Sequence, residues 1–124
     1  MYKGEGARHT REEDDMSERL SIKMGRRTIL LRLEEIDCIE ADRNYIRIHS
    51  NDRVFQVRQT LGGIEKRLQP DRFVRINRSV IVNVDRINEL RASPAYSYQI
   101  VMDDDRGWSW GRKFRANLQR LLVP

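Results

Sequence analysis

Three short polar segments, each with an arginine, lie between apolar stretches of the chain. They are DRN (42–44), NRS (77–79) and GRK (111–113). The planar guanidinium group of arginine can bond to O6 and N7 of guanine together or pair with phosphate, and asparagine can bond to adenine through two atoms. Six residues supply this chemistry: Arg43, Asn44, Asn77, Arg78, Arg112 and Lys113. Short loops on a rigid scaffold suit recognition residues, so the three segments indicate a DNA-binding site.

The middle segment interrupts an apolar stripe. Every second residue from Val74 to Val82 is apolar except Arg78. In a continuous strand these residues would share one face, and burying an unpaired arginine there would be strongly unfavourable. Because Asn77 and Ser79 are turn-forming types, we predict a break or bulge at 77–79 that projects Arg78 outward. A single segment of this kind is most simply a solvated turn, but three of them, one breaking an apolar stripe, favour binding.

The elements that must position these segments are mostly β-strands. Alternating apolar residues predict a hairpin at 45–57, around NDR (51–53), and another at 96–110, around DDDRG (103–107). Helical periodicity is confined to 60–70, where Thr60 can cap the helix and Pro70 end it, and to 113–122. The chain is expected to form seven or eight short strands and two short helices. No long crossover segment exists for a parallel sheet, so the predicted fold is mainly β and antiparallel.

The composition fits one basic domain. The chain has 124 residues and a net charge of +5, but residues 1–18 carry a net −3 and the remainder +8. A basic body is typical of proteins that bind a polyanion. We predict a flexible N-terminal tail or linker at 1–19, which has almost no large apolar side chains, and a folded domain at 20–124. Cys38 is the only cysteine and no apolar run approaches the roughly 20 residues of a membrane span, so a cytoplasmic protein is expected.

Other functions have less support from the residues. The sequence lacks a nucleophile elbow and a phosphate-binding loop, Cys38 is expected in the core and His49 on an outward strand face. We therefore expect no enzyme activity, no cofactor and no metal. A single-stranded RNA-binding module is an alternative, because Trp108 and Trp110 share one strand face and could stack on bases, although packing in a small β core is the preferred interpretation. A protein-interaction module with a basic surface is the other alternative.

The order of the motifs resembles the LytTR family of DNA-binding domains. The resemblance covers roughly residues 20–122 and rests on IEADRNYIRIHS (39–50), FQVRQTLGGIEKRL (55–68), FVRINRSVIVNVDRI (73–87), GRKF (111–114) and LQRLL (118–122). It implies an elongated domain of small antiparallel sheets with two short helices. It also implies loops that enter successive major grooves of double-stranded DNA from one side and bend the duplex.

The resemblance assigns roles to individual residues. The implied base contacts are Asn44, Arg78 and Arg112, and the implied phosphate contacts are Arg43, Arg75 and Lys113. Asn77 stands where the family usually has histidine, and Gly111 where it usually has serine. Both arginines of these motifs are present, so the two differences bear on the preferred base sequence and leave DNA binding expected.

The implied biological role is transcriptional regulation. Family members commonly bind paired sites as homodimers, and many are two-component response regulators with a receiver domain ahead of the DNA-binding domain. Only about 20 residues precede the body of this chain. The expectation is therefore a stand-alone regulator, a fragment of a longer regulator, or a protein that receives its input from an upstream signalling partner.

Overall fold

The described residues form a chain of three antiparallel sheets. A computed structural model describes residues 18–92, 94 and 97–122. Its ten strands are β1 Arg19–Met24, β2 Arg27–Arg32, β3 Ile36–Asp42, β4 Tyr45–Ser50, β5 Arg53–Val57, β6 Phe73–Asn77, β7 Val80–Asn83, β8 Ile87–Ala92, β9 Tyr98–Met102 and β10 Gly107–Trp110. Its helices are α2 Leu61–Glu65 and α3 Arg115–Leu121, with 3-10 turns η1 Leu33–Glu35, η2 Val84–Arg86 and η3 Arg112–Phe114.

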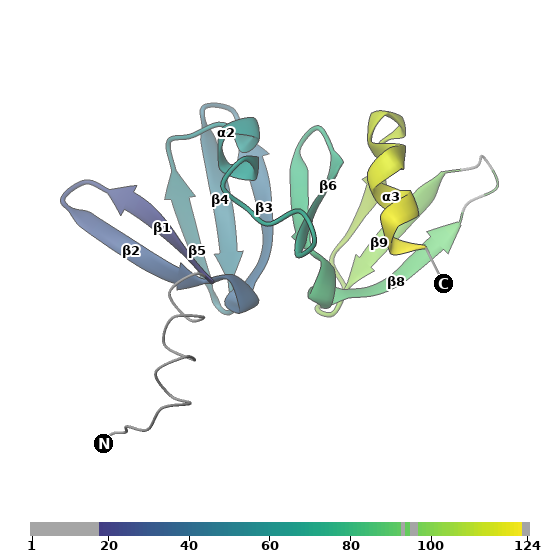
Figure 1. Cartoon of the computed structure of the whole chain (residues 1–124), viewed down its shortest axis with the longest axis horizontal. Coiled ribbons are helices and arrows are strands. Elements are labelled where there is room, and N and C mark those ends of the chain that lie inside the picture. The colour runs from purple at the N-terminus through teal and green to yellow at the C-terminus, as the bar shows by residue number, and fades with distance from the viewer. Residues whose placement is uncertain (1–17, 93, 95–96, 123–124) are drawn as a thin grey trace, which may run out of the picture.

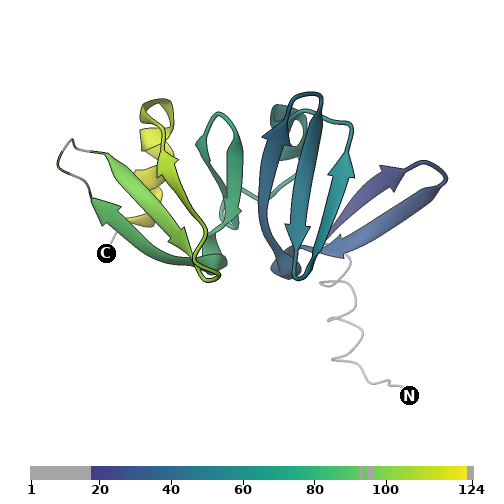
Figure 2. The ribbon, with the colours of Figure 1, turned by 180° about the vertical axis from the view of Figure 1, so that it is seen from behind.

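The sheets lie side by side along the long axis of the molecule (Figure 1, and from behind in Figure 2). A two-stranded sheet, β1-β2, lies at one end. The central sheet has the order β5-β4-β3-β7-β6, and the third sheet has the order β10-β9-β8. The predicted mainly β, elongated antiparallel fold with two short helices is confirmed. None of the described helices is long and apolar enough to cross a membrane.

The predicted elements differ from the structure in number and in length: ten strands form in the described part of the chain where seven or eight were predicted. Strand β1 was not predicted, although Leu20 and Ile22 alternate with exposed residues and are buried against β2. The predicted tail at 1–19 lies outside the described residues except for Glu18 and Arg19, and Arg19 already belongs to β1. The helix predicted at 60–70 is wrong in length, because α2 ends at Glu65.

Helix α2 is short but starts where the sequence predicts. The Thr60 side chain accepts a 3.0 Å hydrogen bond from the backbone N–H of Gly63, which caps the helix. Beyond Glu65 the chain continues in tighter turns, in which Arg67 N–H bonds to the Ile64 carbonyl. The two consecutive glycines lower the helix propensity of so short a segment, which accounts for the early end.

The central sheet separates two hydrophobic cores. The first core joins one face of this sheet to β1, β2 and α2, and the second joins the other face to the third sheet and α3. Successive residues of β7 therefore serve different cores: Ile81 belongs to the first, whereas Val80 and Val82 belong to the second. Strands buried on both faces need continuous apolar runs, which explains the VIV sequence of β7.

This arrangement also explains the interrupted stripe. Val74 and Ile76 on β6 and Val80 and Val82 on β7 all face the second core. The two strands form a hairpin in which Asn77 pairs with Val80, so Arg78 lies in the turn and is exposed. The predicted break at 77–79 is confirmed, and the register also shifts between Arg75 and Asn77.

At the opposite end of β7, a buried asparagine side chain links this strand to β3 and to the turns η1 and η2. Asn83 is 1% exposed. Its side-chain Nδ2 donates to the carbonyl of Ile36 at 2.8 Å and to that of Leu33 at 3.4 Å, and its Oδ1 accepts from the N–H of Asp85 at 2.9 Å. The side chain thus satisfies backbone groups at the starts of both β3 and η2.

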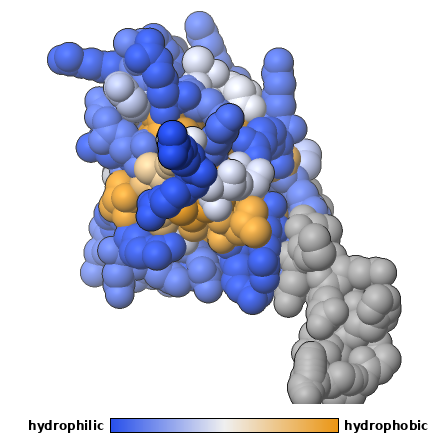
Figure 3. All heavy atoms as spheres, turned by 90° about the vertical axis from the view of Figure 1, so that its left-hand side faces the viewer, coloured by the Kyte–Doolittle hydropathy of each residue, from blue (hydrophilic) through white to orange (hydrophobic). Residues whose placement is uncertain are grey.

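The end of the molecule formed by β1 and β2 carries a band of apolar atoms among hydrophilic ones (Figure 3). Leu30 of β2 and Val54 of β5 are the most exposed of the described large apolar side chains, at 56% and 54%. Isolated exposed apolar side chains are common on soluble domains. The polar segments described next lie elsewhere on the molecule.

Candidate nucleic-acid interface

The three polar segments lie on one edge of the molecule. The β3–β4 turn, the β6–β7 turn and the start of α3 all lie at the top edge in Figure 1. Backbone bonds hold them together: Ala41 N–H donates to the Ser79 carbonyl at 2.8 Å, and Gly111 N–H donates to the Ile76 carbonyl at 2.6 Å. We call residues 43–44, 78–79 and 111–113 together the basic edge.

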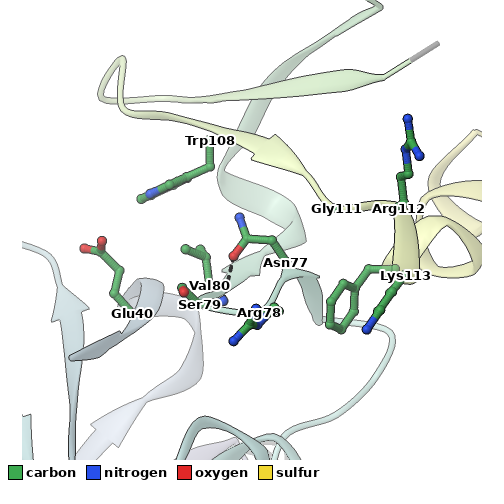
Figure 4. Close-up of a pocket in the computed structure, with 10 residues that line it drawn as sticks. Glu40, Asn77, Arg78, Ser79, Val80, Trp108, Gly111, Arg112 and Lys113 are labelled. Carbon is green, nitrogen blue, oxygen red and sulfur yellow. Dashed lines mark hydrogen bonds between the residues drawn. The ribbon is translucent and has the colours of Figure 1, made fainter. Parts of the chain in front are cut away.

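A groove runs between the second and third segments of the basic edge (Figure 4). Its volume is about 570 Å³. Arg78 lines it from the β6–β7 turn, and Arg112 and Lys113 line it from η3. Its apolar lining includes Val80, Trp108 and Phe114, and its one carboxylate is Glu40. A groove with cationic and apolar lining can hold a phosphate-bearing ligand that also presents flat apolar surface.

Four cations of the basic edge have free side chains. Arg43, Arg78, Arg112 and Lys113 are all exposed. Among the described residues, none of these four side chains takes part in a hydrogen bond or ion pair. Many other arginines of the structure are paired with carboxylates, for example Arg86 with Asp37 at 3.4 Å. The basic edge therefore concentrates unneutralised positive charge.

Arg75 lies behind the basic edge and is already occupied. Its Nη2 donates to the Arg78 carbonyl at 2.8 Å and its Nε to the Asn77 carbonyl at 3.2 Å. Its Nη1 lies 3.1 Å from a carboxylate oxygen of Glu65, and its guanidinium carbon lies 5.4 Å from the ring centre of Phe114. Arg75 thus fixes the backbone of the β6–β7 turn and links it to α2 and η3.

The Asn77 amide is occupied in the same way. Its Oδ1 accepts a hydrogen bond from Ser79 N–H at 2.7 Å, closing the turn. Its Nδ2 donates to the Ser109 carbonyl on β10 at 2.9 Å. The oxygen and the nitrogen of this side chain therefore both form hydrogen bonds within the protein, and Asn77 fastens the β6–β7 turn to the third sheet.

Arg43 adopts an unusual backbone conformation. It occupies the first position of the two-residue turn between Asp42 and Tyr45, with φ +60°. Positive φ is uncommon for residues other than glycine, asparagine and aspartate, and it carries a conformational penalty. Glycine is the residue type that adopts this conformation without penalty.

Gly111 begins η3 without needing the freedom of glycine. Its φ is −74°, and an added Cβ would meet atoms of Asn77 and Phe114 at 3.4 Å, which is ordinary contact. We expect Gly111→Ser to stabilise the protein by up to about 1 kcal/mol, because serine restricts the unfolded chain and can cap η3. Chemical denaturation would measure the change. Gly111→Leu is the control and should stabilise the protein less than serine does, because leucine has no hydroxyl group that could cap η3.

Two groove residues were not among the predicted DNA contacts: Glu40 was given no role, and Trp108 was considered only for base stacking in the RNA-binding alternative. Glu40 lies on β3 and Trp108 on β10, in different sheets. Only the pairing of β3 with β7 and the packing of β10 against β6 bring them together. Trp110, the other candidate for base stacking, is 5% exposed and donates its Nε1 hydrogen to the Phe114 carbonyl at 2.7 Å. Trp110 is therefore a core residue.

The remaining reactive candidate of the described residues is also a core residue. Cys38 is fully buried, and burial raises the pKa of its thiol to about 12. A thiol with that pKa is protonated at neutral pH, so it lacks the thiolate that acts as a nucleophile.

Comparisons with known proteins agree on one domain type. The profile of the LytTr DNA-binding domain matches residues 26–123. The sensory transduction protein LytR of Staphylococcus haemolyticus is 26% identical over 104 residues, which are 84% of this chain and 41% of that protein. The sensory transduction protein LytT of Bacillus subtilis is 25% identical over 84% of this chain and 43% of its own length. The chain thus spans less than half the length of these relatives.

A solved structure shares the fold. The LytTr DNA-binding domain of a Bacillus cereus protein superimposes with a TM-score of 0.73 and 20% sequence identity. The match covers 86% of this chain and 98% of that domain. The three-sheet arrangement described above is therefore that of a LytTr domain.

Proposed function

Because this chain belongs to the LytTR family of DNA-binding domains, we propose that its basic edge binds a specific sequence in double-stranded DNA. The observation that carries the proposal is a group of four cations on three neighbouring turns of one edge, none of which has a hydrogen-bond or ion-pair partner in the described part of the chain. Phosphate contacts supply most of the affinity of such proteins, and side chains that reach base edges supply the sequence preference. Turns at one edge can reach the grooves of one duplex from the same side.

The contacts of each side chain suggest which residues read bases, which contact phosphates and which hold the turn. Arg78 and Arg112 line the groove with free guanidinium groups, and with Asn44 they are the proposed base-reading residues. Arg43 and Lys113 are the proposed phosphate contacts. Arg75 and Asn77 are better suited to hold the β6–β7 turn than to touch DNA, because their polar atoms already bond to the protein.

The relatives suggest the wider role. Among them is the transcriptional regulatory protein LytR of Staphylococcus aureus, which is 28% identical over 81% of this chain. We infer that this chain provides the DNA-binding part of a transcriptional regulator that responds to a signal. Its input would come from a further domain or from an upstream signalling partner, and occupancy of paired sites as a homodimer would suit a regulator of this kind.

In vitro selection from random duplex DNA tests the proposal directly. The selected duplex should bind at least tenfold more tightly than random duplex, and the logarithm of affinity should fall linearly with the logarithm of salt concentration. Failure to enrich any sequence would contradict specific recognition. Tighter binding of single strands would instead support the RNA-binding alternative, which the burial of Trp110 disfavours.

The turn at Arg43 offers a substitution with two opposite effects. We expect Arg43→Gly to raise the free energy of unfolding by about 0.5–1 kcal/mol, because glycine adopts positive φ without penalty. The same change should weaken binding to every duplex and lower the salt slope by roughly one, because one phosphate contact is lost. Denaturation and DNA titrations at several salt concentrations measure the two effects. Unchanged DNA binding together with raised stability would show that Arg43 does not contact DNA.

A further inference from the structure

A second cluster of reactive side chains lies on the central sheet, outside the set of DNA contacts. Cys38 and Glu40 are two residues apart on β3, so their side chains share a face of the sheet. His49, on the neighbouring strand β4, lies directly opposite Cys38. One ligand atom from each of the three residues lies within 4.8 Å of the other two. Sequence reasoning separated Cys38 from His49, because only the strand register brings them together.

The cluster is enclosed but not sealed. Cys38 is fully buried, whereas the side chains of His49 and Glu40 are 19% and 24% exposed. Glu40 Oε2 lies 2.7 Å from His49 Nε2. Glu40 also lines the groove beside Arg78, which gives the cluster a route to solvent. A small ion could enter on this side without opening the second core.

We propose that Cys38, Glu40 and His49 form a binding site for a Zn²⁺ ion. Thiolate sulfur, imidazole nitrogen and carboxylate oxygen are the ligand types that zinc takes in proteins. Tetrahedral bonds of zinc to these atoms would place the ligand atoms about 3.3–3.6 Å apart, so small side-chain rotations would close the site. Coordination would displace the thiol proton of Cys38 to solvent, and a water molecule would complete four ligands. Mg²⁺ and Ca²⁺ are disfavoured, because they avoid sulfur.

Arg106 supplies the surroundings that a metal-bound thiolate needs. Its Nη1 donates to the Cys38 sulfur at 3.3 Å. Its Nη2 lies 2.6 Å from a carboxylate oxygen of Asp104 and 3.7 Å from one of Asp37, so these two carboxylates balance its positive charge. Outer groups that bond to a ligand atom orient it and stabilise its charge.

Cobalt binding tests the site without DNA. The 124-residue chain, stripped with a chelator, should bind one Co²⁺ and develop a thiolate-to-cobalt charge-transfer band and the strong visible bands of tetrahedral cobalt. Added Zn²⁺ should bleach these bands. His49→Gln and Glu40→Gln should each weaken Co²⁺ binding by about tenfold or more, as loss of a ligand demands. His9→Gln, which changes the only other histidine of the sequence, is the matched control and should bind as the parent does.

Each alternative result is decisive. Absence of the charge-transfer band, or parental affinity in both His49→Gln and Glu40→Gln, would overturn the site. Cys38→Ser should abolish the band. If circular dichroism shows that this variant of a buried residue does not fold, the Co²⁺ affinities of His49→Gln and Glu40→Gln still decide whether the site exists. Because DNA is absent from every sample, failure of the metal site and failure of the proposed DNA binding cannot be confused.

Discussion

Arg78→Ala is expected to lower affinity for the selected duplex by about 1–3 kcal/mol and to relax selectivity at one base step. Arg78 is exposed at the tip of the β6–β7 turn, lines the groove and has no side-chain partner among the described residues. The turn itself is held by Arg75 and Asn77, so alanine should leave the backbone in place. Titration of parent and variant against the selected duplex and against single-base variants of it measures the loss.

A variant with the same change in charge controls for electrostatics. Arg53 begins β5 beside the β4–β5 turn, which lies at the edge opposite the basic edge, and its guanidinium carbon lies 4.7 Å from the ring centre of Phe55. Arg53→Ala removes one positive charge and should change specific binding far less. Thermal unfolding of Arg78→Ala should match the parent. Equal losses on specific and random duplex for Arg78→Ala would refute base reading by Arg78.

Asn83→Ala is expected to reduce the free energy of unfolding by about 2–4 kcal/mol, the largest stability effect of the changes considered. The substitution leaves the Ile36 carbonyl and the Asp85 N–H without the side-chain partners that Asn83 gives them. Each buried polar group left unsatisfied is unfavourable by about 1–3 kcal/mol. The melting temperature should fall by roughly 10–30 °C for a domain of this size.

An exposed asparagine provides the comparison for Asn83. Asn88 on β8 is exposed, and Asn88→Ala should change stability by no more than about 0.5 kcal/mol. Scanning calorimetry of the parent and both variants measures the difference. If Asn83→Ala melted with the parent, the network that joins β3, η1 and η2 would not contribute to stability.

Local patterns in the sequence predicted the features that depend on neighbouring residues. The β4–β5 hairpin follows from alternation in YIRIHS and the turn residues after it, and both lie within a dozen residues. The turn at Arg78 follows from one charge in an apolar stripe. The cap at Thr60 follows from its residue type and place. Each of these depends on chemistry that a short window contains.

Features that depend on distant pairing were not predictable in the same way. The pairing of Cys38 with Val82 joins strands from separate parts of the chain, and it decides which core each residue faces. The placement of Glu40 and Trp108 beside one groove follows from such pairings, whereas the cluster around His49 depends on the register of the local β3–β4 hairpin. The same holds for Arg75: the family resemblance implied a phosphate contact, but only the structure shows its bonds to the Asn77 and Arg78 carbonyls and its contacts with Glu65 and Phe114.

Because the central sheet separates the two cores, neighbouring positions on one strand should differ in the substitutions that they tolerate. Ile81 and Val82 are neighbours in sequence but serve different halves of the molecule. A substitution that loosens the packing around Val82 would let η3, which carries Arg112, and the adjoining helix α3 shift against Arg78. One that loosens the packing around Ile81 would leave that pair in place. Variation should therefore accumulate unequally on alternate residues of a single strand.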